Sequence, residues 1–74
     1  MAKNKQTPVQ LVIAEFGGVR PLARAIGRDP GSVSKWQKRD GTIPSSIQRK
    51  VLETAWERGM KITAYEIIFG RDEN

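Results

Sequence analysis

The chain has 74 residues, enough for one small domain, and it contains neither cysteine nor histidine. This composition excludes a disulfide framework, a thiol nucleophile and an imidazole base, and it makes a zinc site unexpected, so we expect no cofactor and no enzymatic activity. Apolar runs of at most four residues fall far short of the roughly 20 that span a bilayer. The first residues are polar and lack an apolar signal core, so we expect a cytoplasmic protein with no membrane partner.

Local signals predict a basic arm followed by a first helix. Residues 1–6 are polar and basic, and we expect them to be flexible. Thr7 is a suitable N-cap, Pro8 suits the first helical position, and Gln10 completes a capping box. The helix should end at Gly17, after apolar residues at helical spacing: Val9, Val12, Ile13 and Phe16.

Two short helices are predicted next, with a tight turn between them. The first starts near Arg20 and closes at Gly27. The second starts at Asp29, an N-cap acid, with Pro30 at its first position, and it runs to about Arg39. The first helix has apolar residues at helical spacing, Val19, Leu22, Ala23 and Ile26, whereas those of the second are only Val33 and Trp36.

The longest predicted helix opens at Pro44 and Ser45, with an apolar stripe along it. Residues 60–69 allow two interpretations. The segment 63–66 looks like a capping box for a short helix, whereas the β-branched and aromatic content would also suit a strand. The sequence therefore predicts one all-α domain over residues 7–70, a compact bundle of four to five short helices, with a strand as the alternative for the C-terminal segment and a polar tail at 71–74.

Positive charge is concentrated in the middle of the chain. Residues 17–50 carry eight basic and two acidic side chains, a net charge of +6, whereas residues 51–74 carry three basic and five acidic ones, a net charge of −2. A basic segment of this density indicates a polyanionic partner, and nucleic acid is the commonest one. The alternative is a solvated surface of mixed charge.

Residues 19–36 carry the pattern that is most informative about function. Gly27 permits the left-handed conformation that a tight turn requires, and Ala23 is small enough for two helices to approach closely. The outer positions of the second helix of this pair are small or basic, which is unusual for a helix with only a packing role. Two helices joined in this way cross steeply, and the second can enter a major groove.

This stretch resembles the helix-turn-helix of the phage Cro and repressor family. Leu22-Ala23, Gly27 and Val33-Ser34-Lys35-Trp36 match the family signature in type and spacing, and Gly41-Thr42-Ile43-Pro44 resembles its loop into the fourth helix. The resemblance covers about residues 8–58. It implies a lambda-repressor-like, all-α DNA-binding domain that acts as a homodimer, at least on DNA, at a pseudo-palindromic operator.

The chain departs from the family pattern around the turn. Arg28 stands where an apolar residue is usual, and Pro30 and Gly31 stand where long polar side chains often read bases. Because Pro30 and Gly31 offer no side-chain donor, we expect base contacts from residues further along the helix: Ser32, Ser34, Lys35 and Lys38.

Basic and hydroxyl side chains around this helix are candidates for phosphate contacts: Arg20, Arg24, Arg28, Arg39, Thr42 and Ser45. For these residues the alternatives are simple solvation and helix capping. The apolar C-terminal segment is a candidate dimer interface formed by Tyr65, Ile67, Ile68 and Phe69, and packing over the fourth helix is its alternative. We expect Trp36 to lie in the core.

The leading hypothesis is a sequence-specific transcriptional regulator of phage or prophage origin, bound to double-stranded DNA in the cytoplasm of a bacterial host, at the nucleoid. The alternative is a protein-interaction module, such as an antitoxin or a phage adaptor, whose complex would be insensitive to salt. A chain of this length has no room for a separate effector domain, so we expect no small-molecule ligand.

Overall fold

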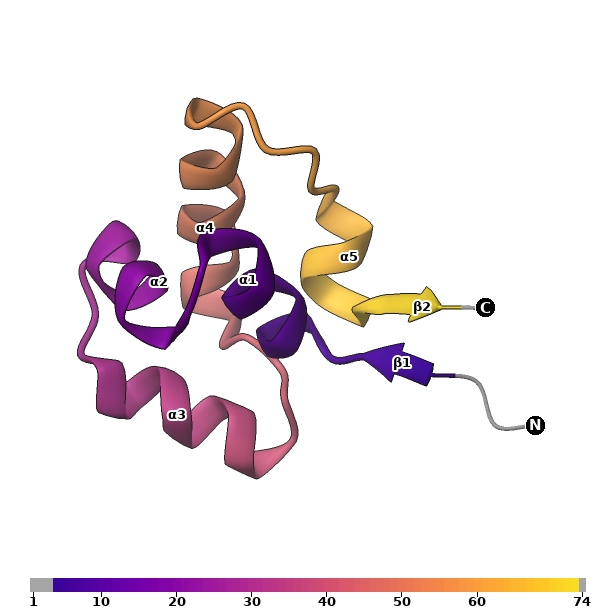
Figure 1. The fold of residues 1–74 in the computed structure, drawn as a ribbon, viewed down its shortest axis with the longest axis horizontal. Helices are drawn as coiled ribbons and strands as arrows, with labels where there is room; N and C mark the ends of the chain where they lie inside the picture. The colour runs from indigo at the N-terminus through magenta and orange to yellow at the C-terminus, as the bar shows by residue number, and fades with distance from the viewer. Residues whose placement is uncertain (1–3, 74) are drawn as a thin grey trace.

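A computed structural model describes residues 4–73, and the side chains of residues 6–71. Five helices pack into a small all-α bundle: α1 (Pro8–Phe16), α2 (Val19–Ile26), α3 (Pro30–Arg39), α4 (Ser45–Glu57) and α5 (Ala64–Phe69) (Figure 1). Two short strands, β1 (Asn4–Gln6) and β2 (Arg71–Glu73), lie at the two ends of the described chain. The predicted fold class is therefore confirmed.

Capping contacts at the helix starts confirm the local signals. The backbone N–H of Gln10 donates to Oγ1 of Thr7 at 3.2 Å, and the Thr7 N–H donates to the Gln10 side chain at 3.0 Å. Thr63 and Glu66 make the same reciprocal pair at 3.1 and 3.0 Å. Each box satisfies two donors that would otherwise lack partners. The second box settles the ambiguous segment as a helix.

The turn between α2 and α3 is as tight as its sequence predicts. Gly27 has φ +71°, a left-handed conformation that favours glycine. Its N–H and that of Arg28 bond back to carbonyls of the last turn of α2, and Asp29 then caps α3 by accepting the Gly31 N–H at 2.9 Å. The three residues between the helices thus turn the chain with their donors largely satisfied.

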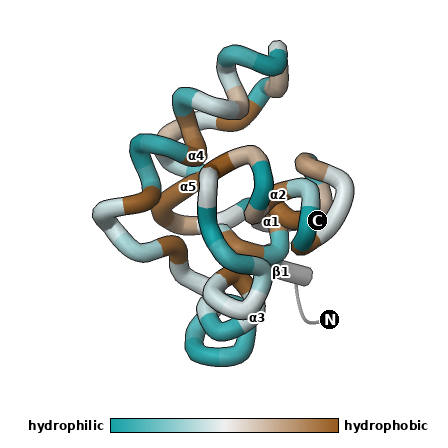
Figure 2. Tube along the Cα trace, turned by 90° about the vertical axis from the view of Figure 1, so that its left-hand side faces the viewer, coloured by the Kyte–Doolittle hydropathy of each residue, from teal (hydrophilic) through white to brown (hydrophobic). Residues whose placement is uncertain are grey.

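The core lies where the five helices meet. Its fully buried members are mostly aliphatic, and Trp36, with 9% of its surface exposed, belongs to it as predicted. Leu11 is also fully buried, although it lies off the predicted apolar face of α1. In Figure 2 the trace of α3, at the lower edge of the molecule, is mostly hydrophilic.

Residues 4–6, predicted as part of a flexible arm, and residues 71–73, predicted as a polar tail, form strands in the structure. These segments pair as an antiparallel ribbon with Asn4 opposite Glu73 and Gln6 opposite Arg71 (Figure 1). Arg71 anchors the ribbon, because its Nε donates to Glu66 at 2.7 Å and its guanidinium also lies 3.7 Å from Glu15. Residues 1–3, the rest of the predicted arm, lie outside the described residues.

Candidate nucleic-acid interface

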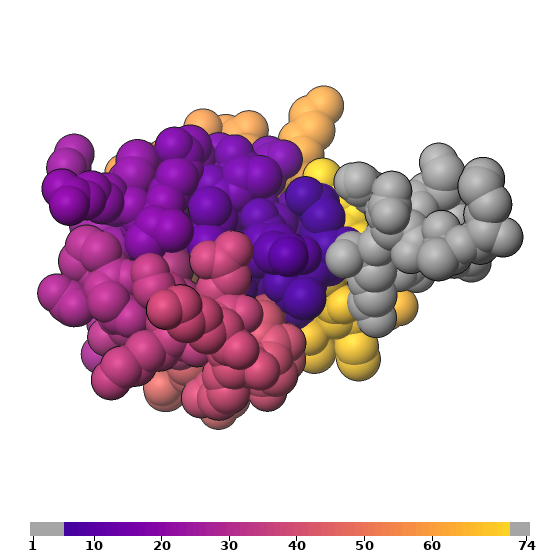
Figure 3. All heavy atoms as spheres, turned by 60° about the horizontal axis from the view of Figure 1, so that its bottom comes forward, coloured from indigo at the N-terminus to yellow at the C-terminus, as the bar shows by residue number. Residues whose placement is uncertain are grey.

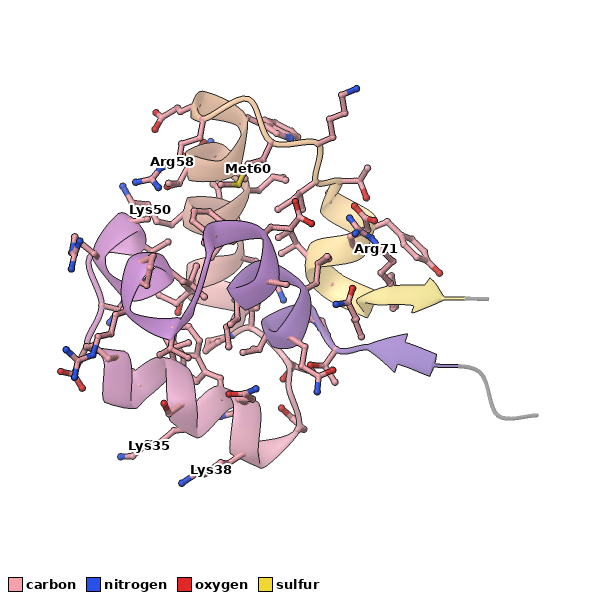
Figure 4. The ribbon with its side chains drawn as sticks, viewed as in Figure 1. Lys35, Lys38, Lys50, Arg58, Met60 and Arg71 are labelled. Atoms are coloured by element: carbon pink, nitrogen blue, oxygen red, sulfur yellow. The ribbon has the colours of Figure 1, made fainter. Side chains whose placement is uncertain are left out.

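The helix α3 presents a polar stripe on the side away from the core. Val33 and Trp36 are buried, and residues of a helix are spaced about 100° apart around its axis. The opposite side therefore carries Gly31, Ser34, Lys35 and Lys38, which we call the outer stripe. Figure 4 shows the labelled Lys35 and Lys38 reaching out from the same side of α3, away from the bundle.

Both lysines of the outer stripe are exposed and carry no acidic partner within the described part of the chain. Ser34 lies beside them and is half-buried. Ser32, also predicted as a base contact, is half-buried like Ser34 and lies one helical turn before Lys35, at the edge of the stripe. The structure therefore places Ser34, Lys35 and Lys38 on the stripe and Ser32 beside it.

A cationic hollow lies beside the stripe, between α2 and the start of α3. Its lining is Arg20, Ala23, Arg24, Arg28 and Pro30, and its volume is about 250 Å³. We call it the arginine hollow. The three predicted phosphate contacts from α2 and the turn thus share one surface depression. In Figure 3, which turns the lower face of Figure 1 toward the viewer, the atoms of α2 lie next to those of α3.

The loop after α3 holds a carboxylate that the sequence-based interpretation ignored. Oδ1 of Asp40 accepts the Thr42 hydroxyl at 2.6 Å and the Thr42 N–H at 3.0 Å, and the Arg39 Nε lies 3.4 Å from the same atom. The hydroxyl bond, helped by the backbone bond and Arg39, lowers the pKa of Asp40. The N–H and hydroxyl of Thr42, predicted to meet phosphate, thus already donate to a carboxylate. Of the Arg39 guanidinium, only the Nε–H is directed at this carboxylate.

The start of α4 leaves donors available on the far side of that loop. Pro44 occupies the N-cap position, and no side chain caps the helix within the described residues. The Pro44 carbonyl accepts the N–H groups of Ile47 and Gln48. Ser45, at the first position, is exposed, and neither its hydroxyl nor its N–H bonds to a described residue. Ser45, a predicted phosphate contact, thus lies at a helix start with free donors, and the contact itself stays a prediction.

Three of the four residues of the predicted dimer surface are exposed, whereas Ile67 is buried. Tyr65, Ile68 and Phe69 are 67%, 46% and 54% exposed, and the rings of Tyr65 and Phe69 lie 4.7 Å apart. Ile67 is only 2% exposed and belongs to the core, because this face of α5 packs on α1 and α4. We call Tyr65, Ile68 and Phe69 the α5 patch. Trp56, on α4, is also 57% exposed.

Beside the α5 patch, a depression of about 190 Å³ lies between α4 and α5 and is lined mostly by apolar atoms of Leu52, Ala64, Ile67 and Ile68. No group of three or more metal-ligating side chains occurs among the residues that were searched, which are the described ones. Over the same residues, no helix is long and apolar enough to cross a membrane.

Comparisons of the chain with protein-family models, with curated proteins and with solved structures give no match.

Sequence reasoning missed two features of this surface. The first is the convergence of Arg20, Arg24 and Arg28 on one hollow, which their spacing of four residues along α2 and its turn could have revealed. The second is Asp40, whose position directly before Gly41 and Thr42 is typical of a side chain that bonds to its own turn.

Proposed function

We propose that the protein is a sequence-specific, double-stranded DNA-binding transcriptional regulator that places α3 in the major groove. The observation that carries this proposal is the outer stripe, which offers Ser34, Lys35 and Lys38 to a partner and has no bulky apolar residue. The major groove, about 12 Å wide, admits a helix, and a lysine there can donate to O6 and N7 of guanine.

Phosphate contacts on both sides of α3 would fix its register in the groove. Arg20, Arg24 and Arg28 supply positive charge on the α2 side, and Ser45 supplies free donors at the start of α4. Such contacts position a protein without reading sequence. They also make binding steeply dependent on salt, with a slope of about −0.9 per phosphate neutralised.

A second copy of the chain would complete the operator reader. Half-sites one helical turn apart, about 34–36 Å, require two recognition helices related by a two-fold axis. The α5 patch supplies exposed apolar surface on a different helix from the outer stripe, so the same molecule could pair there and still bind DNA. From the resemblance to the Cro and repressor family, we also propose that the protein acts in the cytoplasm of a bacterium that hosts the phage or prophage.

A protein-interaction module, such as an antitoxin or a phage adaptor, is the second candidate. The specific observation in its favour is again the α5 patch, because exposed aromatic side chains are enriched where proteins bind one another. In this alternative the patch binds a different protein, and the outer stripe has no DNA to meet.

Selection from a random pool of DNA duplexes tests the proposal. The full chain is mixed with the pool at low salt, and the bound fraction is recovered and sequenced. The proposal expects an enriched inverted repeat whose half-site spacing gives the geometry of the dimer. Binding with no enriched sequence would contradict sequence-specific reading. No binding at low salt would remove the DNA proposal and favour the protein-interaction module.

A further inference from the structure

We propose that the arginine hollow is a phosphate-binding site, which takes a phosphate group from a DNA backbone or from a small phosphorylated molecule. Binding of a free phosphate compound in the hollow does not depend on the proposed function. Binding of a DNA backbone phosphate there rests on the proposed function, and the experiments below distinguish the two sources.

The partners of the arginines distinguish the hollow from the rest of the surface. Among the arginines that the structure describes, every one outside the hollow has a partner: Arg39 pairs with Asp40, Arg49 with Glu53, Arg71 with Glu66, and Arg58 lies over the ring of Phe16 at 5.6 Å. In that same set, Arg20, Arg24 and Arg28 have none. The unpartnered guanidinium groups are thus those that share one depression.

The acidic residue nearest along the chain does not neutralise the hollow. Asp29 follows Arg28 directly, but its Oδ2 accepts the Gly31 N–H at 2.9 Å and caps α3. The proline beside it has no N–H, so the start of α3 brings no free backbone donor from that position. An anion in the hollow would therefore be held by guanidinium groups, and not by the end of the helix.

The shape of the hollow suits a phosphate group. Ala23, with 1% of its surface exposed, lines the depression with a methyl group only, and this leaves about 250 Å³ between the arginines. That volume is large enough to admit a phosphate group. Guanidinium groups match phosphate oxygens in paired, two-point hydrogen bonds, which an ammonium group cannot reproduce.

Electrostatic repulsion among the three arginines of the isolated chain also favours a bound anion in the hollow. Arg20 and Arg24 are one helical turn apart, and like charges at this spacing repel each other. Arg28 adds a third positive charge a further four residues along. A bound dianion would relieve this repulsion, whereas a purely structural surface gains nothing from concentrating these charges.

The first experiment titrates inorganic pyrophosphate into the full chain and follows the arginine Nε–H and backbone amide signals by NMR, with sodium chloride at equal ionic strength as the reference. We expect saturable shifts that centre on residues 20–31. Shifts that never saturate and spread evenly over the surface would overturn the free-molecule source, because they report ionic screening only.

Three variants sharpen this titration. Replacing Arg20, Arg24 and Arg28 together by glutamine should abolish the saturable shifts, and replacing them by lysine should weaken binding at least about tenfold, the factor expected when a charge-assisted hydrogen bond is lost. Arg49→Gln, which removes a charge on α4, should leave the affinity within about twofold. Unchanged binding by the glutamine variant, with its circular dichroism unaltered, would overturn this assignment of the site.

The second experiment distinguishes the sources. If the hollow also seats a backbone phosphate, pyrophosphate should displace a labelled duplex more than sodium chloride does at equal ionic strength, and the glutamine variant should show a salt slope smaller by about one. Saturable pyrophosphate binding without any DNA binding would keep the phosphate site and reject the proposed function. DNA binding with an unchanged salt slope, together with no saturable pyrophosphate binding, would overturn the inference.

Discussion

At the scale of single residues, Lys35 and Lys38 point away from the bundle and have no ion-pair partner among the described residues. A long cationic side chain that reaches into solvent from a helix can serve a nucleic acid without first breaking an ion pair. This makes Lys35 the residue on which the reading role is best tested.

Replacing Lys35 by alanine should weaken binding to the selected operator and relax its specificity by about 1–3 kcal/mol at one base pair, because one contact to a base edge is lost. Fluorescence anisotropy on the operator and on variants changed at single base pairs measures both effects. Lys61→Ala, which removes an equal charge from the segment between α4 and α5, is the matched control. Equal losses on operator and scrambled DNA would contradict the reading role of Lys35.

The ion pair between Glu66 and Arg71 should make the stability of the fold depend on pH. The hydrogen bond from Arg71 is the largest cause that lowers the pKa of Glu66 below its ordinary value of 4.5. The charged carboxylate therefore stabilises the native state above pH 4.5, and this stabilisation should be lost as the pH falls through the lowered value. Urea unfolding from pH 7 down to pH 2 measures it.

Glu66→Gln isolates the charge, because glutamine can still complete the capping box with Thr63. At pH 7 the variant should lose about 1 kcal/mol of unfolding free energy, and its stability should fall less than that of the wild type below pH 4.5. Parallel pH profiles of the two proteins would show that the Glu66–Arg71 pair does not hold β2 on α5 as the structure indicates.

At the scale of elements, two glycines make a matched test of the turns. Gly27, between α2 and α3, has φ +71°, and a Cβ there would meet nothing within 4 Å. Gly70, between α5 and β2, has φ +83°, and a Cβ there would collide with the Gln6 carbonyl oxygen. Gly27→Ala should cost about 1–2 kcal/mol from backbone strain alone.

Gly70→Ala should cost more, about 2–4 kcal/mol, because overpacking against β1 adds to the same strain. Midpoints of urea unfolding at constant slope measure both costs. A smaller cost at Gly70 than at Gly27 would mean that β1 does not pack against the end of α5.

The elements that could be predicted from sequence are those defined by neighbours in the chain. Capping residues such as Thr7 and Thr63 act on N–H groups three residues away, so their signal is local and correct. The ribbon of β1 and β2 joins residues nearly the whole chain apart, and its short polar strands have no pattern of their own. The burial of Ile67 could not be predicted for a related reason, because three consecutive apolar residues do not show which of them faces inward.

The same distinction applies to the candidate interface. The outer stripe follows from helical spacing once Val33 and Trp36 are placed in the core. The engagement of Thr42 by Asp40 has a local signal, because an aspartate two residues before a threonine in a turn commonly bonds to that turn. The Thr42 hydroxyl, predicted to meet phosphate, donates to this carboxylate.

At the scale of the whole molecule, the basic and the exposed apolar surfaces lie on different helices. The outer stripe and the arginine hollow belong to α2, α3 and their turn, whereas the α5 patch lies on α5. This separation lets one surface meet a polyanion while the other meets a protein. It also makes the two functions separable by mutation.

Phe69→Ser should weaken self-association of the chain while leaving the fold intact, because the ring is 54% exposed. In a two-fold interface each substitution counts twice, and burial of an aromatic ring contributes about 1.5–3 kcal/mol, so the dimer constant should fall at least about 100-fold. Sedimentation equilibrium, alone and with an inverted-repeat duplex, measures it. Tyr65→Ser should act in the same direction, and unchanged association in both variants would place the dimer interface elsewhere.

The central claim is that the α2–α3 side of the molecule binds duplex DNA. Its most direct test is an NMR titration of the full chain with a random-sequence duplex at low salt, which needs no known operator. We expect the amide shifts to concentrate in residues 20–45 and to be absent from α5. No shifts, or shifts confined to the α5 patch, would contradict the claim.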